Sequence, residues 1–459
     1  MIPMTLAEVA GVVGGRLVDG DPDIVVTVAA SDDRDCVPGT LFACIAGERV
    51  DGHDFIATAR ERGAVAALAT RPVGSPAILV EDVVLALGRL ASYVIQRLPG
   101  TLVLGLTGSS GKTTTKDLLA SILAPHGETV APRGSFNSEV GLPLTVLSCT
   151  TRTKYLVLEM GMRGTGHIRY LCDIAHPRIA GVINVGSAHL ELLGSHEAIA
   201  EAKGEIIEAL PADGTAILHA DNALVMAQRD RTVAHVVTFG EAPGADLRAT
   251  DVQLDERARP RFTLHWQGSS VPVALTLSGE HQVANALAAT AFALAAGIAL
   301  ADVVAALETY VPASKWRMEV SERPDGVTIV NDAYNANPES MRAALKALAA
   351  MGQGRRTWAV LGEMREIGPT SVEEHDSLGR LAVRLDISRL IAVGEGARAL
   401  HLGAMQEGSW GNESVWVPDI DAAIALLSDE VQPGDIVLVK ASRSIGLERV
   451  AAALLEQAT

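Results

Sequence analysis

The sequence predicts a multidomain α/β protein built around parallel sheets, and two observations support this prediction. From about residue 102 onward, short apolar runs alternate with amphipathic stretches, as strands and helices do in a parallel sheet. The same alternation starts again near residue 327, after a Pro-containing segment at 310–314 that we interpret as a linker. A chain of 459 residues is long enough for roughly two to four domains.

The first segment alternates short strands and helices and contains no phosphate-binding loop. Residues 5–13 predict a short helix, and residues 39–45 predict a strand. The change of pattern near residue 99 and the linker then divide the chain into three predicted domains, with the bounds 1–98, 99–313 and 314–459.

Composition and charge narrow the classes of protein and partner. Hydrophobic residues make up 48% of the chain, and the net charge of −17 disfavours a nucleic-acid partner. The N-terminus lacks the basic and apolar regions of a signal peptide, and the Ala-rich stretch at 286–301 is shorter than the roughly 18 residues of a membrane span. We expect a cytoplasmic monomer with no membrane insertion. The cysteines are too scattered for a disulfide framework or a zinc site: Cys36, Cys44, Cys149 and Cys172.

Residues 107–115 (TGSSGKTTT) form the most informative motif of the chain. They follow an apolar run at 102–106 and lead into an amphipathic stretch at 117–123, so they connect a predicted strand to a predicted helix. In such a loop the backbone amides and the helix N-terminus point at anionic oxygens, a lysine adds a charge, and a threonine hydroxyl can hold Mg²⁺. We interpret the motif as a nucleoside triphosphate site rather than a plain turn, with these ligands: Gly108, Ser109, Ser110, Gly111, Lys112, Thr113 and Thr114.

Polar residues follow other predicted strands of the central segment. Glu159 follows the run at 155–158, and the run at 179–183 is followed by Asn184, Ser187 and His189. Ligands of parallel sheets bind beyond the carboxyl ends of the strands, so these side chains are expected near the nucleotide and its metal.

The third segment has no phosphate loop of its own. We predict strands near 327–330, 358–361, 390–393 and 436–439, each of which is a short apolar run. Three of these strands are followed by polar segments, at 331–338, 362–368 and 440–443. We therefore expect the edge of the sheet where these strands end to face the central domain.

Taken together, these motifs are similar to those of the Mur ligase family over nearly the whole chain. The family's phosphate loop is likewise shorter than the general one, which accounts for Leu106 where the general pattern has glycine. The N-terminal string at 47–55 (GERVDGHDF) resembles the uridine-nucleotide domain of the branch that adds D-alanyl-D-alanine. The resemblance rests on the phosphate loop and on NSEVGLP at 137–143, EMG at 159–161, NVGSAHL at 184–190, AKGE at 202–205, HQVAN at 281–285, NDAYNANP at 331–338 and LGEM at 361–364.

The resemblance implies an ATP-dependent amide ligase of peptidoglycan precursor synthesis. It implies a uridine-nucleotide-binding α/β domain, a central P-loop ATPase-like domain and a C-terminal Rossmann-like ligase domain. The implied partners are UDP-N-acetylmuramoyl-tripeptide and D-alanyl-D-alanine, which are joined through an acyl phosphate with release of ADP and phosphate. The third residue of the tripeptide is diaminopimelate or lysine.

The resemblance also implies two Mg²⁺ ions beside ATP, held by Thr113, Glu159, His189 and Lys203. From the sequence alone, Glu159 is a metal ligand or a cap of a nearby loop, because an unpaired carboxylate at the end of a buried strand is costly. Lys203 is either a solvent-facing cation or, as the family implies, a carbamylated lysine whose added carboxylate binds the metal. Together with Lys112, these residues make up the implied catalytic set.

Further residues correspond to family positions that meet ATP or substrate. Asn285 and His281 begin the Ala-rich helix, as nucleotide contacts or as caps. Lys440 and Arg443 are substrate-binding residues or solvated cations. Positions that meet ATP when the domains close correspond to Arg317, Asp332, Asn335 and Asn337. Asn337 is also a candidate for binding the substrate. Without ligand we expect an open arrangement, with Asp332 far from Lys112.

The substrate side is expected in two places. Asn137 and Ser138 should reach the muramyl-peptide. Phe42 and Phe55 could stack on uracil, although Phe42 also fits the core. The candidates for the uridine nucleotide are Ser31, Arg34, Arg49, Gly52, His53, Asp54 and Phe55.

Two alternatives stand beside this interpretation. One is another Mur-type or folylpolyglutamate-type ligase, against which the strings 363–368 and 51–55 argue. The other is a P-loop switch or kinase, which would leave Lys203, the third segment and the N-terminal string without a role.

Overall fold

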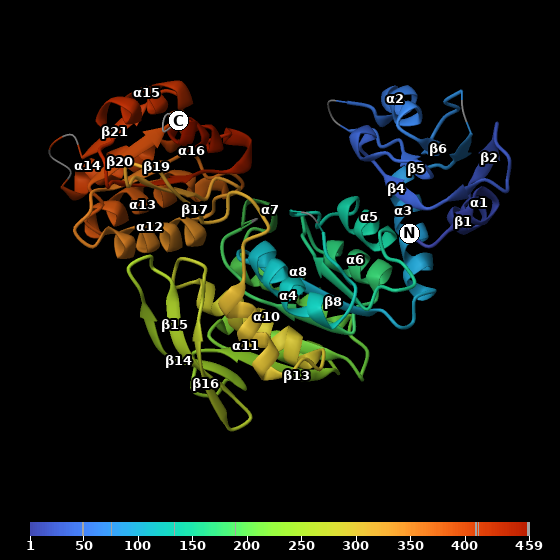
Figure 1. The fold of residues 1–459 in the computed structure, drawn as a ribbon, viewed down its shortest axis with the longest axis horizontal. Helices are drawn as coiled ribbons and strands as arrows, with labels where there is room; N and C mark the ends of the chain where they lie inside the picture. The colour runs from blue at the N-terminus through green and yellow to red at the C-terminus, as the bar shows by residue number, and fades with distance from the viewer. Residues whose placement is uncertain are drawn as a thin grey trace.

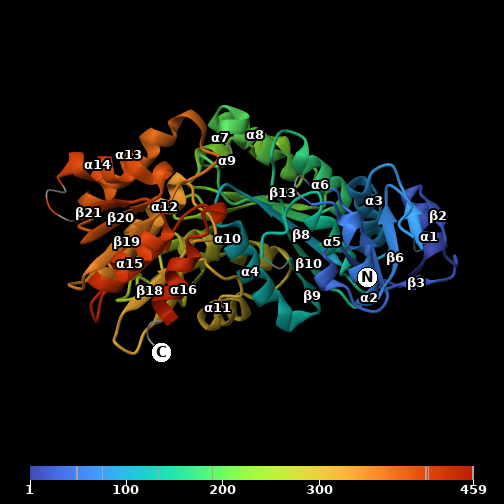
Figure 2. The ribbon, with the colours of Figure 1, turned by 90° about the horizontal axis from the view of Figure 1, so that it is seen from above.

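Three domains follow one another along the chain, each around its own main sheet (Figure 1). The computed structural model describes residues 1–47, 50–74, 76–132, 134–188, 190–408, 411 and 413–456. The N-terminal and C-terminal domains lie at opposite ends of the molecule with the central domain between them, which is clear from above in Figure 2. The predicted α/β class with parallel sheets is confirmed.

The N-terminal domain contains a five-stranded sheet in the order β2-β7-β6-β5-β4, parallel except for the β2–β7 pair. Thr5 and Asp82 cap its first and last helices through their side chains, which satisfies amides that the helix itself leaves unpaired. The strands are β1 Met4–Thr5, β2 Arg16–Val18, β3 Val25–Val26, β4 Val28–Ala30, β5 Thr40–Ala43, β6 Ala64–Ala69 and β7 Ala77–Leu79, and the helices are α1 Leu6–Val13, α2 Ile56–Glu61 and α3 Val83–Gln96.

The central domain contains a nine-stranded sheet in the order β16-β15-β14-β13-β12-β11-β8-β10-β9. Strand pairs from β9 to β14 are parallel, whereas β14, β15 and β16 are antiparallel, because short turns rather than helices join them. This antiparallel extension departs from the predicted alternation. The strands are β8 Leu102–Thr107, β9 Thr129–Val130, β10 Tyr155–Glu159, β11 Ile179–Val182, β12 Thr215–His219, β13 His235–Gly240, β14 Leu247–Leu254, β15 Pro260–Trp266 and β16 Ser269–Ala274.

Helices cover both faces of this sheet, as the buried strand β8 requires. Leu104 and Leu106 point into the core beneath α4, α10 and α11, whereas Val103 points into the core beneath α5, α6 and α8. The helices are α4 Lys112–Leu123, α5 Gly141–Leu147, α6 His167–Ala175, α7 Leu190–Leu193, α8 His196–Glu208, α9 Ala223–Met226, α10 Gln282–Ala295 and α11 Leu300–Thr309.

The C-terminal domain contains a six-stranded sheet in the order β17-β18-β22-β19-β20-β21, parallel except for the β17–β18 pair. Its four predicted strands appear within a residue or two of their expected bounds. The strands are β17 Glu319–Glu322, β18 Thr328–Asn331, β19 Thr357–Leu361, β20 Arg389–Val393, β21 Ser414–Val417 and β22 Ile436–Lys440, and the helices are α12 Pro338–Gly352, α13 Ser371–Arg384, α14 Arg398–Glu407, α15 Ile420–Glu430 and α16 Glu448–Glu456.

Two further sequence expectations can be compared with the fold. All four cysteines are buried and unpaired, as expected. Over the described ranges of the chain, every helix is too short or too polar to pass through a lipid bilayer.

Candidate active site

A cavity of about 820 Å³ lies where the three domains meet. Its walls come mainly from the central and C-terminal domains, and the start of α3 adds Asp82, Val84 and Leu85. The structure brings together at this cavity the following predicted residues: Ser109, Ser110, Gly111, Lys112, Thr113, Thr114, Asn137, Ser138, Glu159, His281, Asn285, Arg317, Asp332, Asn335, Asn337 and Lys440.

The phosphate loop leads from the carboxyl end of β8 into α4. Gly111 has φ 75°, and a Cβ there would lie 2.2 Å from Oδ1 of Asn285, so only glycine fits. The first turn of α4 has no side-chain cap, which leaves its amides available to an anion. The Nζ of Lys112 donates to the Gly108 carbonyl at 2.7 Å.

Glu159 lies at the end of β10 directly beneath this loop, with 1% of its surface exposed. Its two oxygens accept separate hydrogen bonds, one from Oγ1 of Thr113 and one from Nδ2 of Asn137, each at 2.7 Å. A buried carboxylate and a hydroxyl beside a phosphate loop are the hard oxygen ligands that Mg²⁺ prefers. The site therefore fits the predicted metal, and Glu159 also orders the segment that contains Asn137.

Lys203 is not a solvent-facing cation, which corrects one of the two sequence alternatives. It projects from α8 with 1% of its surface exposed, and its Nζ donates to the Gly108 carbonyl at 3.1 Å. Lys112 uses the same carbonyl, so two lysines meet beneath one loop. Burial and the neighbouring Lys112 hold the pKa of Lys203 well below its ordinary value.

The C-terminal domain contributes a set of polar residues from the ends of β18 and β22 and from the segment before β17. The buried Lys440 donates to Oδ2 of Asp332 at 2.5 Å and to the Asn335 carbonyl at 2.9 Å. The guanidinium of Arg317 lies over the ring of Tyr334 at 4.1 Å and donates to Oγ of Ser135 at 2.9 Å.

The expected separation of Asp332 from Lys112 without ligand is wrong for this structure, since both line one cavity. The two domains are held together by hydrogen bonds that cross between them. Arg317 bonds to Ser135, and Nδ2 of Asn337 reaches the Ser109 carbonyl at 3.4 Å. The C-terminal domain is thus docked on the phosphate loop.

Arg443 does not line the cavity. Its guanidinium lies 4.2 Å from the centre of the Trp316 ring and pairs with Glu448 at 2.5 Å. His281 does line the cavity, and burial lowers its pKa to about 4, so the ring is neutral near pH 7.

The uridine-side candidates that the structure describes belong to the N-terminal domain and do not line the cavity. Phe42 has 1% of its surface exposed, so it belongs to the core and is not a stacking platform. Nδ1 of His53 lies 2.6 Å from Asp51, and Nε2 accepts from the Thr70 amide, which ties the turn around residue 53 to the end of β6. Arg49 and His189 lie outside the described residues. The other candidates are Ser31, Arg34, Gly52, Asp54 and Phe55, and these assignments, like those of His53, Arg49 and His189, stay predictions.

Asn184, which its position after a predicted strand placed near the nucleotide, does line the cavity. It accepts from the amides of Ser109 and Ser110 at 2.7 and 2.9 Å, and so shapes the phosphate loop. Sequence reasoning assigned no role to one further residue of this site. Glu339, in the first turn of α12, also lines the cavity, and nothing in its local sequence distinguishes it from an ordinary helical glutamate.

Three family models match the chain. The Mur ligase family catalytic-domain model covers residues 30–93, the Mur ligase middle-domain model covers 106–293, and the Mur ligase glutamate-ligase-domain model covers 316–443. The chain belongs to the Mur ligase family. The resemblance inferred from the sequence motifs is thereby confirmed, and the phosphate loop, Glu159 and Asp332 all fall within the matched ranges.

Similarity to individual proteins extends over the whole length. A curated relative from Mycobacterium tuberculosis, named UDP-N-acetylmuramoyl-tripeptide–D-alanyl-D-alanine ligase, is 47% identical and is matched over 100% of this chain and 99% of its own. A crystal structure of MurF from Acinetobacter baumannii superposes with a TM-score of 0.89 at 33% identity, with 99% of both chains covered. MurF ligase from Thermotoga maritima in complex with ADP gives a TM-score of 0.81 at 31% identity, covering 94% of this chain and 98% of that one.

Proposed function

We propose that this chain is an ATP-dependent amide ligase that joins D-alanyl-D-alanine to UDP-N-acetylmuramoyl-tripeptide, releasing ADP and phosphate in peptidoglycan precursor synthesis. One observation carries the proposal. A phosphate loop with a buried Glu159 faces Asp332, Lys440 and Arg317 across a single cavity. The full-length relatives named for this reaction give the substrates.

The chemistry starts from an unreactive carboxylate, because an amine cannot displace oxide from it. Transfer of the γ-phosphoryl group of ATP to the tripeptide carboxylate forms an acyl phosphate, from which phosphate can leave. Two anions must approach one another in this step, so positioning and neutralisation of charge dominate catalysis. Lys112 and the amides of the phosphate loop supply positive charge at that position.

Mg²⁺, held by Glu159 and Thr113 with His189 as a further proposed ligand, would neutralise the triphosphate charge. The hydrogen bond of Asn137 to Glu159 beside the phosphate loop supports its proposed contact with the muramyl-peptide, and Ser138 is proposed to make a second contact there. On the other side of the cavity, Asp332, Asn335 and Arg317 are proposed to meet ATP.

The amine of D-alanyl-D-alanine then attacks the acyl carbon, and phosphate leaves through a tetrahedral intermediate. Water would destroy the acyl phosphate, so docking of the C-terminal domain serves to exclude it. Asn337 and Lys440 are proposed substrate residues on this side. In the docked arrangement the guanidinium of Arg443 contacts Trp316 and Glu448 instead, so we do not propose it as a substrate residue there.

Lys203 is proposed to be carbamylated and to hold the second Mg²⁺. Addition of CO₂ to its neutral amine, with release of one proton, would give a carbamate that carries a negative charge next to Lys112. A site that disfavours the ammonium form of Lys203 would then hold an attractive pair, which is the physical support for the modification.

A phosphate-release assay tests the proposed reaction. Release that requires both UDP-N-acetylmuramoyl-tripeptide and D-alanyl-D-alanine is the expected result, and Lys112→Ala should abolish it. Phosphate release in the absence of both substrates would favour a P-loop switch or kinase. Release with glutamate as the only amine would favour a folylpolyglutamate-type ligase.

Further assignments complete the proposal. The domain bounds are 1–98, 99–313 and 314–459, and the first of these domains takes the uridine nucleotide. The protein acts as a cytoplasmic monomer. The third residue of its tripeptide substrate is diaminopimelate or lysine, and comparison of kcat/KM for the two tripeptides decides between them.

A further inference from the structure

A carboxylate of the C-terminal domain reaches across to a loop of the central domain. Oε1 of Glu339 accepts two hydrogen bonds from Ser187, one from the backbone amide at 2.9 Å and one from the hydroxyl at 2.8 Å. Ser187 lies in the loop between β11 and α7, with 8% of its surface exposed. We call this pair of hydrogen bonds the Glu339–Ser187 contact.

The backbone next to Ser187 makes room for this approach. A Cβ on Gly186 would lie 2.9 Å from the carboxyl carbon of Glu339, so a side chain there would obstruct the contact. The Ser187 hydroxyl is also 3.1 Å from Nε2 of His196, the first residue of α8. With Nε2 protonated, His196 donates to Ser187 and Ser187 donates to Glu339, which polarises both bonds in one direction.

Gly186, the residue before Ser187, links the Glu339–Ser187 contact to the phosphate loop. The amide of Gly186 donates to Oγ of Ser109 at 2.8 Å, and this hydroxyl donates back to the Gly186 carbonyl at 3.2 Å. A displacement of the phosphate loop is therefore transmitted to Ser187 through one neighbouring residue. The same α8 that begins at His196 also contains Lys203.

On the C-terminal side, Glu339 stands on a rigid turn. Asn337 caps α12 and forms a capping box with Ser340, with hydrogen bonds of 2.8 and 3.0 Å. The turn follows directly on the segment that contains Asp332 and Asn335. Fixing Glu339 to the central domain therefore fixes the position of those two residues over the phosphate loop.

We propose that Glu339 is a positioning residue that docks the C-terminal domain through Ser187 and so raises the affinity for ATP. The inference rests on the proposed function for its meaning in catalysis, but its binding test does not. A hydrogen bond to a charged group stabilises more than one between neutral groups. Because the Glu339–Ser187 contact is hydrogen-bonded through Gly186 to the phosphate loop, ATP binding and docking of the C-terminal domain favour one another.

The test compares Glu339→Ala, Glu339→Gln and Glu374→Ala by equilibrium binding of a non-hydrolysable ATP analogue. Glu374→Ala is the matched control. It also removes a glutamate that holds α12, but the partner of Glu374 is Arg342 of α12 at 2.6 Å, so this ion pair lies within the C-terminal domain. We expect Glu339→Ala to weaken binding roughly tenfold or more. Glu339→Gln keeps an acceptor oxygen, so its affinity for the analogue should fall only roughly threefold. Glu374→Ala should bind the analogue with the affinity of the wild-type protein.

Hydrogen exchange of residues 184–188 gives a second readout, which should be faster in Glu339→Ala and unchanged in Glu374→Ala. Ser187→Ala combined with Glu339→Ala should weaken binding no further than Glu339→Ala alone. Unchanged affinity and exchange in Glu339→Ala, or equal effects of Glu374→Ala, would overturn the inference. Absence of ligase turnover in the unchanged chain would instead count against the proposed function, while the binding comparison still decides the role of Glu339.

Discussion

Lys203 and Lys112 share one carbonyl acceptor although 91 positions separate them in sequence (203 minus 112), and this pairing sets the chemistry of Lys203. A buried ammonium beside another ammonium is unfavourable, because both lose hydration and repel one another. The site thus favours a form of Lys203 that is neutral or negative.

We predict that Lys203→Ala is nearly inactive in phosphate release and that short carboxylates such as formate or acetate partly restore its rate. The added carboxylate would replace the carbamate that the alanine variant cannot form. The same additives should leave Lys112→Ala inactive, because that variant lacks a cation. Full activity of Lys203→Ala without additive would contradict the proposed carbamate.

Site residues differ in how far the sequence alone could place them. Gly111 and Lys112 belong to a continuous motif, so their arrangement follows from local backbone geometry. Glu339 meets Ser187 across 152 positions, and no local pattern distinguishes it from a surface residue. Lys203 appeared ambiguous for the same reason, since its burial depends on how α8 packs beneath the loop.

At the scale of secondary-structure elements, α13 is tied to the polar segment after β19 by one buried histidine. The Nδ1 of His375 lies 2.6 Å from the Ser371 carbonyl, and its Nε2 accepts from the Met364 amide at 2.9 Å. The bond to Nε2 requires a neutral ring, because a protonated Nε2 cannot accept, and burial lowers the pKa of His375 below its ordinary value.

This histidine predicts a pH dependence of stability. Below its unfolded pKa of about 6.5 the unfolded chain binds a proton that the folded chain does not. Its contribution is therefore complete above about pH 6.5 and is lost as the pH falls, by up to about 1.4 kcal/mol per pH unit. Urea unfolding between pH 7.5 and 5 should show a smaller loss in His375→Gln. An equal slope in His375→Gln and in His235→Gln, which replaces an exposed histidine, would contradict the assignment.

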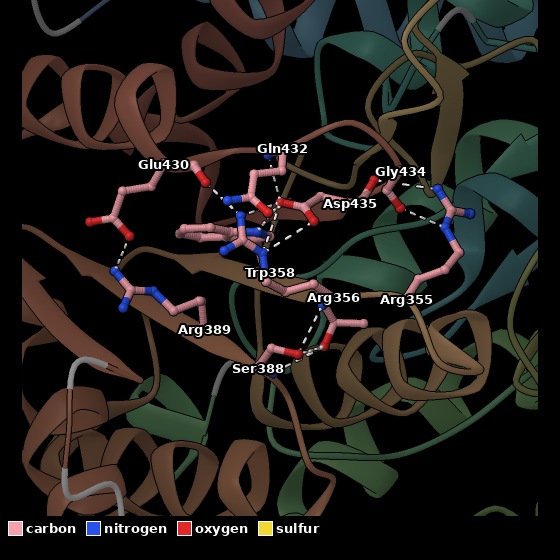
Figure 3. A network of polar contacts seen from close by, with 10 residues as sticks. Arg355, Arg356, Trp358, Ser388, Arg389, Glu430, Gln432, Gly434 and Asp435 are labelled. Carbon is pink, nitrogen blue, oxygen red and sulfur yellow. Dashed lines mark hydrogen bonds and ion pairs between the residues drawn. The ribbon is translucent and has the colours of Figure 1, made fainter.

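A second element-scale feature joins the amino ends of β19 and β22, on the side of the sheet away from the cavity. The buried carboxylate of Asp435 accepts from Nη2 of Arg356 at 2.7 Å and from Nε1 of Trp358 at 2.8 Å (Figure 3). The guanidinium groups of Arg356 and Arg389 lie 4.8 and 5.1 Å from the Trp358 ring. The network is confined to the C-terminal domain.

We predict that Asp435→Ala lowers the free energy of unfolding by roughly 3–5 kcal/mol, because it leaves buried donors without their carboxylate. Chemical denaturation measures the change. The exposed pair of Asp421 with Arg449 is the control, and Asp421→Ala should cost less than about 1 kcal/mol. ATP affinity of folded Asp435→Ala should stay unchanged, and a loss of affinity would show that the network also shapes the cavity.

At the scale of the whole molecule, docking of the C-terminal domain completes the cavity. Arg317, Asn337 and Glu339 all reach the central domain through hydrogen bonds. Arg257 also pairs with Glu322 across the boundary at 2.9 Å. Interfaces between domains of one chain resemble transient protein–protein interfaces, so an equilibrium between docked and undocked arrangements is the expected behaviour of a three-domain ligase. ATP that contacts both sides of the cavity would favour the docked arrangement.

We predict that an ATP analogue together with UDP-N-acetylmuramoyl-tripeptide reduces the radius of gyration measured by small-angle X-ray scattering. Lys112→Ala, which lacks the charge that binds the triphosphate, should show no such change at the same ligand concentrations. An unchanged radius of gyration in the wild-type protein would mean that the domains stay docked without ligand or that closure is not linked to these ligands.

The α/β class, the phosphate loop, the family and the strands of the C-terminal sheet could be predicted from the sequence, because each depends on local periodicity or on a continuous motif. Other features became visible only in the tertiary structure. It buried Lys203, withdrew Arg443 to Trp316, placed Phe42 in the core and brought Glu339 to Ser187. It also added the antiparallel strands β14–β16, whose short turns left no helix to mark them. Apart from these neighbouring strands, the outcomes depend on contacts between residues far apart in the chain, which no local pattern encodes.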